Sequence, residues 1–136
     1  MEIRHAAAPS VPSVMSTDPR HELGRIGEQL AAEHFERLGY EVIARNHRTR
    51  LGELDLVLAD EETLVFCEVK TRRAGSGAPW DALGEAKRSR VRSMAVAWLS
   101  QAQNRPRTSR LRFDAVGVIL DAHGALVSLD HLEAAF

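Results

Sequence analysis

The sequence predicts an α/β fold in which a mixed central sheet is flanked by helices. Three observations support this prediction. An amphipathic helix pattern covers residues 21–39, three short apolar strand patterns follow between residues 40 and 70, and a second helix pattern over residues 81–100 precedes further strand patterns. The expected order is therefore a helix, a three-strand meander, a helix and a strand, with one late extra strand.

Length and composition indicate one globular domain. The chain has 136 residues, of which 44% are hydrophobic and 27% charged. Residues 1–20 are rich in Ala, Pro and Ser, so we expect a disordered N-terminal tail before a single domain over residues 21–136. Cys67 is the one cysteine, which excludes an intramolecular disulfide and a cysteine-based zinc cluster. With no secretory signal and no apolar run near the roughly 20 residues of a membrane span, we expect a cytoplasmic protein without a membrane partner.

The first helix pattern contains two unexpected glycines. Gly24 and Gly27 fall on or beside its apolar stripe, and each costs about 1 kcal/mol of helix propensity relative to Ala. This cost is understandable if the helix approaches the sheet closely. Glu28 lies at the edge of the same stripe, where a glutamate that reaches out to water is the simpler interpretation.

A strand over residues 40–44 is followed by a basic connector, residues 45–51, which is expected to be a hairpin loop. The connector includes Arg48 and Arg50. It is either a solvated turn or a contact to phosphate groups.

The next two strand patterns, residues 52–58 and 63–70, each contain charged side chains among apolar ones. Alternation places Leu54, Leu56 and Leu58 on one face and Asp55 on the other, while Glu68 and Lys70 share a face. An ionised carboxylate in an apolar strand is costly unless it is paired, hydrogen-bonded or bound to a metal. An antiparallel meander would bring Asp55 and Glu68 within a few ångströms, where a cation between them would relieve their repulsion.

Basic residues are concentrated in the middle of the chain. Residues 45–112 hold 14 of the 18 basic and 8 of the 19 acidic residues, a surplus of six positive charges that favours a polyanionic partner. Lys87 lies near the centre of the stripe of the second helix, where its stem covers apolar surface or its ammonium reaches the carboxylates or a phosphate. The expected nucleic-acid contacts are Arg48, Arg50, Arg72, Arg73, Lys87 and Arg90.

The last part of the chain predicts strands over residues 111–120 and 125–129. Asp114 is interpreted as a structural carboxylate with an ion-pair partner, and the tail is expected to pack Leu132 and Phe136 on the sheet. Cys67 is expected to be a core residue. The histidines lack the spacing of metal ligands, and four are expected at the surface: His21, His34, His47 and His131.

The charged strand residues suit metal-assisted hydrolysis of a phosphodiester. Asp55 and Glu68, joined by the backbone carbonyl of Val69, would hold Mg²⁺ (or Mn²⁺), and a bound water would be the nucleophile. Lys70 would orient or deprotonate that water and offset negative charge in the transition state. Glu28 would ligate the metal directly or through water.

Four ordered motifs resemble the bacterial YraN-type family of small proteins: G-x-x-G-E from Gly24, G-E-L-D-L-V from Gly52, V-F-C-E-V-K-T-R from Val65 and R-F-D-A-V-G-V from Arg112. That family is similar to PD-(D/E)xK nucleases and to archaeal Holliday junction resolvases. The resemblance implies a restriction-endonuclease-like core. It places four side chains on the acidic and lysine positions of the superfamily: Glu28, Asp55, Glu68 and Lys70. Lys87 matches a place that often carries a basic or amide side chain, and Leu54 replaces the superfamily's proline.

Three hypotheses follow. The first is a metal-dependent endonuclease acting on DNA, with branched or repair intermediates as candidate substrates. The second is a nucleic-acid-binding module that has the nuclease fold but little or no turnover. The third treats Asp55, Glu68 and Lys70 as a structural ion-pair network. A homodimer is an assembly that the analogy with junction-cleaving enzymes would allow.

Overall fold

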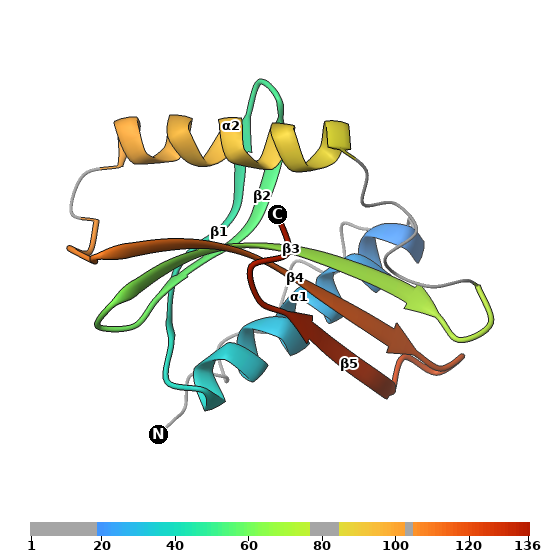
Figure 1. Ribbon diagram of the computed structural model, residues 1–136. Coiled ribbons are helices and arrows are strands. Elements are labelled where there is room, and N and C mark those ends of the chain that lie inside the picture. Colours follow the sequence, from blue (N-terminus) through green and yellow to red (C-terminus); the bar gives the residue numbers. More distant parts are fainter. Residues whose placement is uncertain (1–18, 77–84, 103–104) are drawn as a thin grey trace.

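The computed structural model describes residues 19–76, 85–102 and 105–136 (Figure 1). Its elements, in chain order, are α1 (Pro19–Arg37), β1 (Glu41–Thr49), β2 (Gly52–Ala59), β3 (Thr63–Arg73), α2 (Glu85–Gln101), β4 (Arg110–Leu120) and β5 (Leu126–Leu132). This order confirms the predicted α/β class and its restriction-endonuclease-like core of helix, meander, helix and strand. The tail expected over residues 1–20 lies almost entirely outside the described residues.

The five strands form one mixed sheet in the order β1-β2-β3-β4-β5. β3 and β4 are parallel and are connected through α2, whereas the other neighbouring strands are antiparallel. Figure 1 shows α1 and α2 on opposite sides of the sheet. This layering is the predicted mixed sheet flanked by helices.

Each helix covers one apolar face of the sheet. On the α1 side, Phe35 packs in a cluster with Val65 and Val116, and on the α2 side Trp98 packs in a cluster with Phe66. Strand alternation explains the division, because neighbouring residues of one strand point to opposite faces. Leu54 departs from it. We expected Leu54 to share a face with Leu56, but Leu54 belongs to the α2-side cluster and Leu56 to the α1-side cluster.

Three strands extend beyond their predicted ends. Most of the basic connector, residues 45–51, is strand, because β1 pairs with β2 as far as Thr49 opposite Gly52. β3 continues to Arg73, where it pairs with Leu120 of β4. β5 continues to Leu132, which pairs with Ala115. Backbone pairing with the neighbouring strand thus determines where each strand ends. The sequence pattern did not indicate these ends, because the added residues are largely polar.

The expectations for the second helix and the tail are confirmed in part. Val91, Met94 and Trp98 form the buried stripe of α2, and the neighbouring Arg90 is exposed. The side chain of Lys87 lies outside the described residues. In the tail, Phe136 packs against the α2-side cluster, whereas Leu132 is exposed, contrary to expectation.

None of the helices within the described ranges is both long and apolar enough to span a bilayer.

Candidate functional site

β2 and β3 stop pairing at the point where their charged residues begin. Their antiparallel register runs from Ala59 opposite Leu64 to Leu56 opposite Cys67 and goes no further. The side chain of Asp55 takes the place of the next ladder contact. Its Oδ2 atom accepts a hydrogen bond of 2.8 Å from the backbone N–H of Val69. Asp55 is therefore fixed between the two strands by the backbone of β3.

Glu68 and Lys70 lie on β3 at the same place. Glu68 is 6% exposed and Asp55 is 9% exposed, so both carboxylates are buried. The Nζ atom of Lys70 is 3.6 Å from Oε2 of Glu68, and the lysine side chain is partly exposed. Alternation along β3 places both side chains on the face of Phe66, as the sequence predicted. The buried carboxylates of Asp55 and Glu68 thus lie near the partly exposed side chain of Lys70.

The close packing of α1 on β3 places Glu28. A Cβ atom on Gly27 would overlap the side chain of Thr71, the residue after Lys70. Gly27 is therefore required for this contact, which confirms the expectation of close helix–sheet approach. Gly24 has open space around it, so the same explanation does not apply there.

Glu28 itself is half-buried and does not simply extend into water. Burial raises its pKa above the usual value, and the nearby carboxylates of Glu53 and Glu68 raise it further. A hydrogen bond from Asn46 and the charge of Arg45 oppose this shift. Glu28 thus experiences the field of the carboxylates on β2 and β3, which supports its predicted place beside the site.

The oxygen atoms around the strand gap suit a hard divalent cation. In an extended strand the N–H and C=O groups of one residue point to the same strand edge, so the carbonyl of Val69 opens toward the gap that holds Asp55. Among the described residues no group of three or more His, Cys, Asp or Glu side chains could hold a metal ion. Two carboxylates, one carbonyl and several waters nevertheless form a donor set that Mg²⁺ accepts.

The basic residues expected to contact nucleic acid occupy different places. Arg48 and Arg50 are exposed at the β1–β2 hairpin, and Arg90 is exposed on α2. Arg72 is half-buried and donates to the carbonyl of Thr71. Arg73 donates to the carbonyls of Asp121 and Ala122, which commits part of its guanidinium to the β4–β5 turn.

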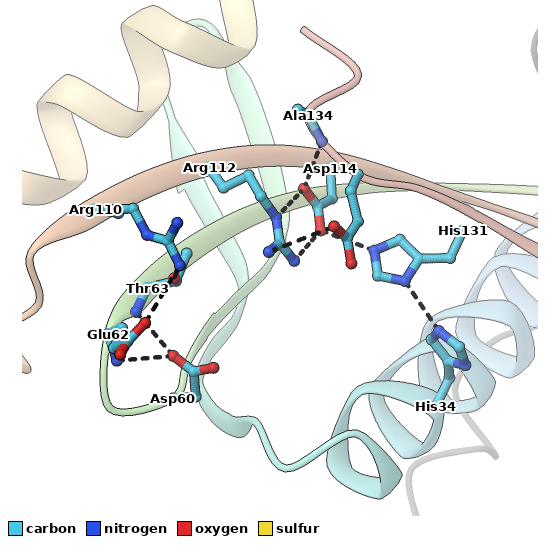
Figure 2. Close-up of polar contacts among 10 residues, drawn as sticks. His34, Asp60, Glu62, Thr63, Arg110, Arg112, Asp114, His131 and Ala134 are labelled. Atoms are coloured by element: carbon cyan, nitrogen blue, oxygen red, sulfur yellow. Dashed lines mark hydrogen bonds and ion pairs between the residues drawn. The ribbon is translucent and has the colours of Figure 1, made fainter.

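A second polar group surrounds Asp114 and includes two histidines that the sequence analysis did not connect with it (Figure 2). Asp114 is fully buried and accepts hydrogen bonds from Arg112 at 2.8 Å, from His131 Nε2 at 2.8 Å and from the N–H of Ala134 at 3.1 Å. The Nδ1 atom of His131 is 3.0 Å from Nε2 of His34 on α1. Asp114 is thus a structural ion-pair partner, as predicted. His34 and His131, expected at the surface, are partly buried parts of this network.

The network keeps Asp114 ionised. Burial alone would raise its pKa, but the hydrogen bonds from His131, Arg112 and Ala134 outweigh burial and hold that pKa below its usual value. No spacing rule could have revealed these contacts, because His34 and His131 are 97 residues apart. Cys67, also buried, has its pKa raised well above the usual value by burial and by nearby carboxylates, so it is a core thiol.

Comparison with known proteins identifies similar chains. Residues 27–118 match the model of a family described as "Uncharacterised protein family UPF0102". A UPF0102 protein of Acidothermus cellulolyticus is 47% identical over 109 residues, covering 74% of this chain and 83% of the relative. A UPF0102 protein of Rhodococcus opacus is 44% identical over 115 residues, covering 84% and 95% of the two chains. One of Pelotomaculum thermopropionicum is 40% identical over 120 residues, covering 88% and 98%.

Proposed function

The chain belongs to the UPF0102 family, the YraN-type family that its motifs resemble, and we propose that it is a metal-dependent endonuclease that hydrolyses phosphodiester bonds in DNA. One observation carries this proposal: two buried carboxylates, Asp55 and Glu68, meet beside Lys70 where β2 leaves β3. Negatively charged oxygen ligands and a positive charge at one place are what metal-assisted hydrolysis of a polyanion needs.

The residues of the gap divide the chemistry among them. Asp55, Glu68 and the carbonyl of Val69 would hold Mg²⁺ or Mn²⁺, with Glu28 ligating it directly or through water. The metal would supply an activated water as nucleophile and an electrophile for the phosphate oxygens. Lys70 carries its ammonium beside Glu68, where it would orient the attacking water and stabilise the charge that develops on the phosphate.

Cleavage assays with a panel of DNA substrates test this function. We expect the protein to nick or cut DNA with Mg²⁺ or Mn²⁺, with branched and repair intermediates in the panel beside linear duplex. Asp55→Ala and Lys70→Ala should each reduce the rate at least about 100-fold, because each removes a group that acts in the transition state. Asp130→Ala, an exposed acid on β5, is the matched control and should retain full activity. An inactive wild type across linear, flapped, nicked and four-way DNA would contradict the proposal.

A nucleic-acid-binding module with little or no turnover is the second candidate. It is favoured by the finding that, within the described part of the chain, no three His, Cys, Asp or Glu side chains form a ready metal cluster. Its signature would be DNA binding that weakens with salt, survives Asp55→Ala and is accompanied by no cleavage.

A further inference from the structure

The tip of the β1–β2 hairpin exposes an apolar side chain. Thr49 pairs with Gly52, which leaves Arg50 and Leu51 as the two residues of the turn. Leu51 is 50% exposed. Singly exposed apolar side chains are common on protein surfaces, so the setting of Leu51, and not its exposure alone, bears on its function.

The tip is held in a single shape. The hydroxyl of Thr49 donates to the carbonyl of Gly52 at 2.9 Å and accepts from the N–H of Leu51 at 3.0 Å. Gly52 has φ of 137°, a conformation that other residues rarely adopt. Leu51 is therefore presented outward by a fixed turn.

The hairpin is also supported from behind by α2. In Figure 1 it rises beside that helix. A Cβ atom on Gly52 would lie 3.6 Å from the sulfur of Met94, and a groove of about 500 Å³ separates the tip from Ala97 and Gln101. This support would resist bending of the tip when a ligand presses on Leu51.

Positive charge surrounds the tip and continues toward the carboxylates. Arg50 precedes Leu51 in the turn, and the side chain of Arg48 is 83% exposed. Arg48 lines the groove against α2 and also a second groove of about 500 Å³, which includes Glu28 and Glu53. A phosphate backbone bound at the tip could thus pass Arg48 toward Glu28, one of the four candidate site residues.

We propose that Leu51 is a wedge that inserts into the base stack of DNA while Arg48 and Arg50 hold the flanking phosphates. This inference rests on the proposed nuclease function and specifies its substrate class: duplexes whose base stacking is already interrupted, such as those with a gap or a bulge. Inserting an apolar side chain between base pairs costs unstacking energy, and that cost is smallest where stacking is already broken.

The proposal also predicts where the cut falls. Leu51 and Asp55 are four residues apart, about 13 Å if the chain between them is extended. At about 3.4 Å per nucleotide step, the scissile phosphate lies about four nucleotides from the unstacked position. Mapping the ends of the cleavage products on gapped DNA measures this distance.

The test uses the full chain and a duplex carrying 2-aminopurine beside a one-nucleotide gap, because the fluorescence of this base rises when it unstacks. The protein carries Asp55→Asn, so that the measurement does not depend on cleavage. At saturating concentration the fluorescence should rise, and adding Leu51→Ala should abolish most of the rise. Leu111→Ala is the matched control, since Leu111 is also 50% exposed but lies at the start of β4.

Cleavage provides the second measurement. In the wild-type background, Leu51→Ala should lower the preference for gapped over intact duplex about tenfold, whereas Leu51→Phe should keep it. The wedge is overturned if the 2-aminopurine fluorescence still rises when Leu51→Ala is added to Asp55→Asn. It is also overturned if the Asp55→Asn protein, which keeps Leu51, causes no rise at saturating concentration. Failure of the nuclease proposal appears separately, as intact DNA with the wild type, and leaves the fluorescence result interpretable.

Discussion

Two groups of buried carboxylates lie in the same sheet, and they differ in what surrounds their charge. Asp114, on the α1 face, is neutralised by the guanidinium of Arg112, which donates two hydrogen bonds of 2.8 Å. Asp55 and Glu68 lie where β2 separates from β3, and the Nζ atom of Lys70 is 3.6 Å from Glu68. The first group contains a neutral ion pair; the second sets two buried carboxylates near the ammonium of Lys70.

The difference separates a structural from a functional arrangement of buried charge. A carboxylate whose hydrogen bonds and charge are satisfied by fixed donors of the fold would not be stabilised further by a ligand. Two neighbouring carboxylates repel one another and would be stabilised by a divalent cation. α1 connects the groups, because it carries His34 at one end and Glu28 toward the other. Four experiments test this contrast.

The largest effect is expected from Asp114→Ala. It removes the partner of Arg112 and the acceptor of His131, so the free energy of unfolding should fall by about 3 kcal/mol. Unfolding in urea measures the loss. Asp130→Ala, an exposed acid on β5, serves as control and should change stability by less than about 0.5 kcal/mol. A similar small change for Asp114→Ala would remove the basis for calling this group structural.

A smaller loss is expected from Gly27→Ala, which forces the helix away from Thr71. Overpacking of this kind costs about 1–3 kcal/mol, and the displacement of Glu28 should also slow any metal-dependent cleavage. Combining it with Thr71→Ala should restore much of the stability, because the two changes act on one contact. If stability does not recover in the double variant, the contact between residues 27 and 71 is not the cause.

For Asp55→Asn we expect a stability change within about 1 kcal/mol, in either direction, because removing one of two repelling charges offsets what is lost. Mg²⁺ should raise the melting temperature of the wild type and leave that of the variant unchanged. Thermal melts with and without Mg²⁺ measure both effects. A loss as large as that of Asp114→Ala would place Asp55 in the structural class.

The smallest effect concerns pH. Burial, followed by the charges of His131 and Arg37, lowers the pKa of His34, so the folded state favours neutral imidazole. Below about pH 6.5 the unfolded chain binds the extra proton, and stability should fall as pH decreases from there toward the folded pKa. His34→Gln should reduce the dependence of the melting temperature on pH between about pH 7 and 5.5. His123→Gln, on the exposed β4–β5 turn, should leave this dependence unchanged. If the melting temperature of His34→Gln depends on pH as strongly as that of the wild type, His34 is not the source of the pH dependence.

Much of the fold and part of the site follow from local patterns. Helical spacing predicts both helices, and alternation predicts that Glu68 and Lys70 share a face. The charges at positions 55, 68 and 70 were noticeable because each interrupts an apolar strand, where burial makes a charge costly. These inferences need only the preferences of neighbouring residues.

The remaining features depend on partners that are distant in the sequence. The polar second half of β1 resembles a loop, and only its pairing with β2 makes it a strand. Leu54 and Leu56 point to different clusters, in the same stretch where β2 separates from β3. The contact of His34 with His131 required the complete fold. Single-residue preferences contain no information about such contacts.

The separation of His34 from His131 also bears on the order of folding. The hairpin of β2 and β3 turns within a few residues, and structures of this kind form in about 1–10 μs. Asp55, Glu68 and Lys70 can therefore be brought together by a local event. Docking α1 against the last strand closes a loop of 97 residues and is expected much later. Glu28 depends on the contact of Gly27 with Thr71, which is also distant in sequence, so it would be the last of the four candidate residues to reach its place.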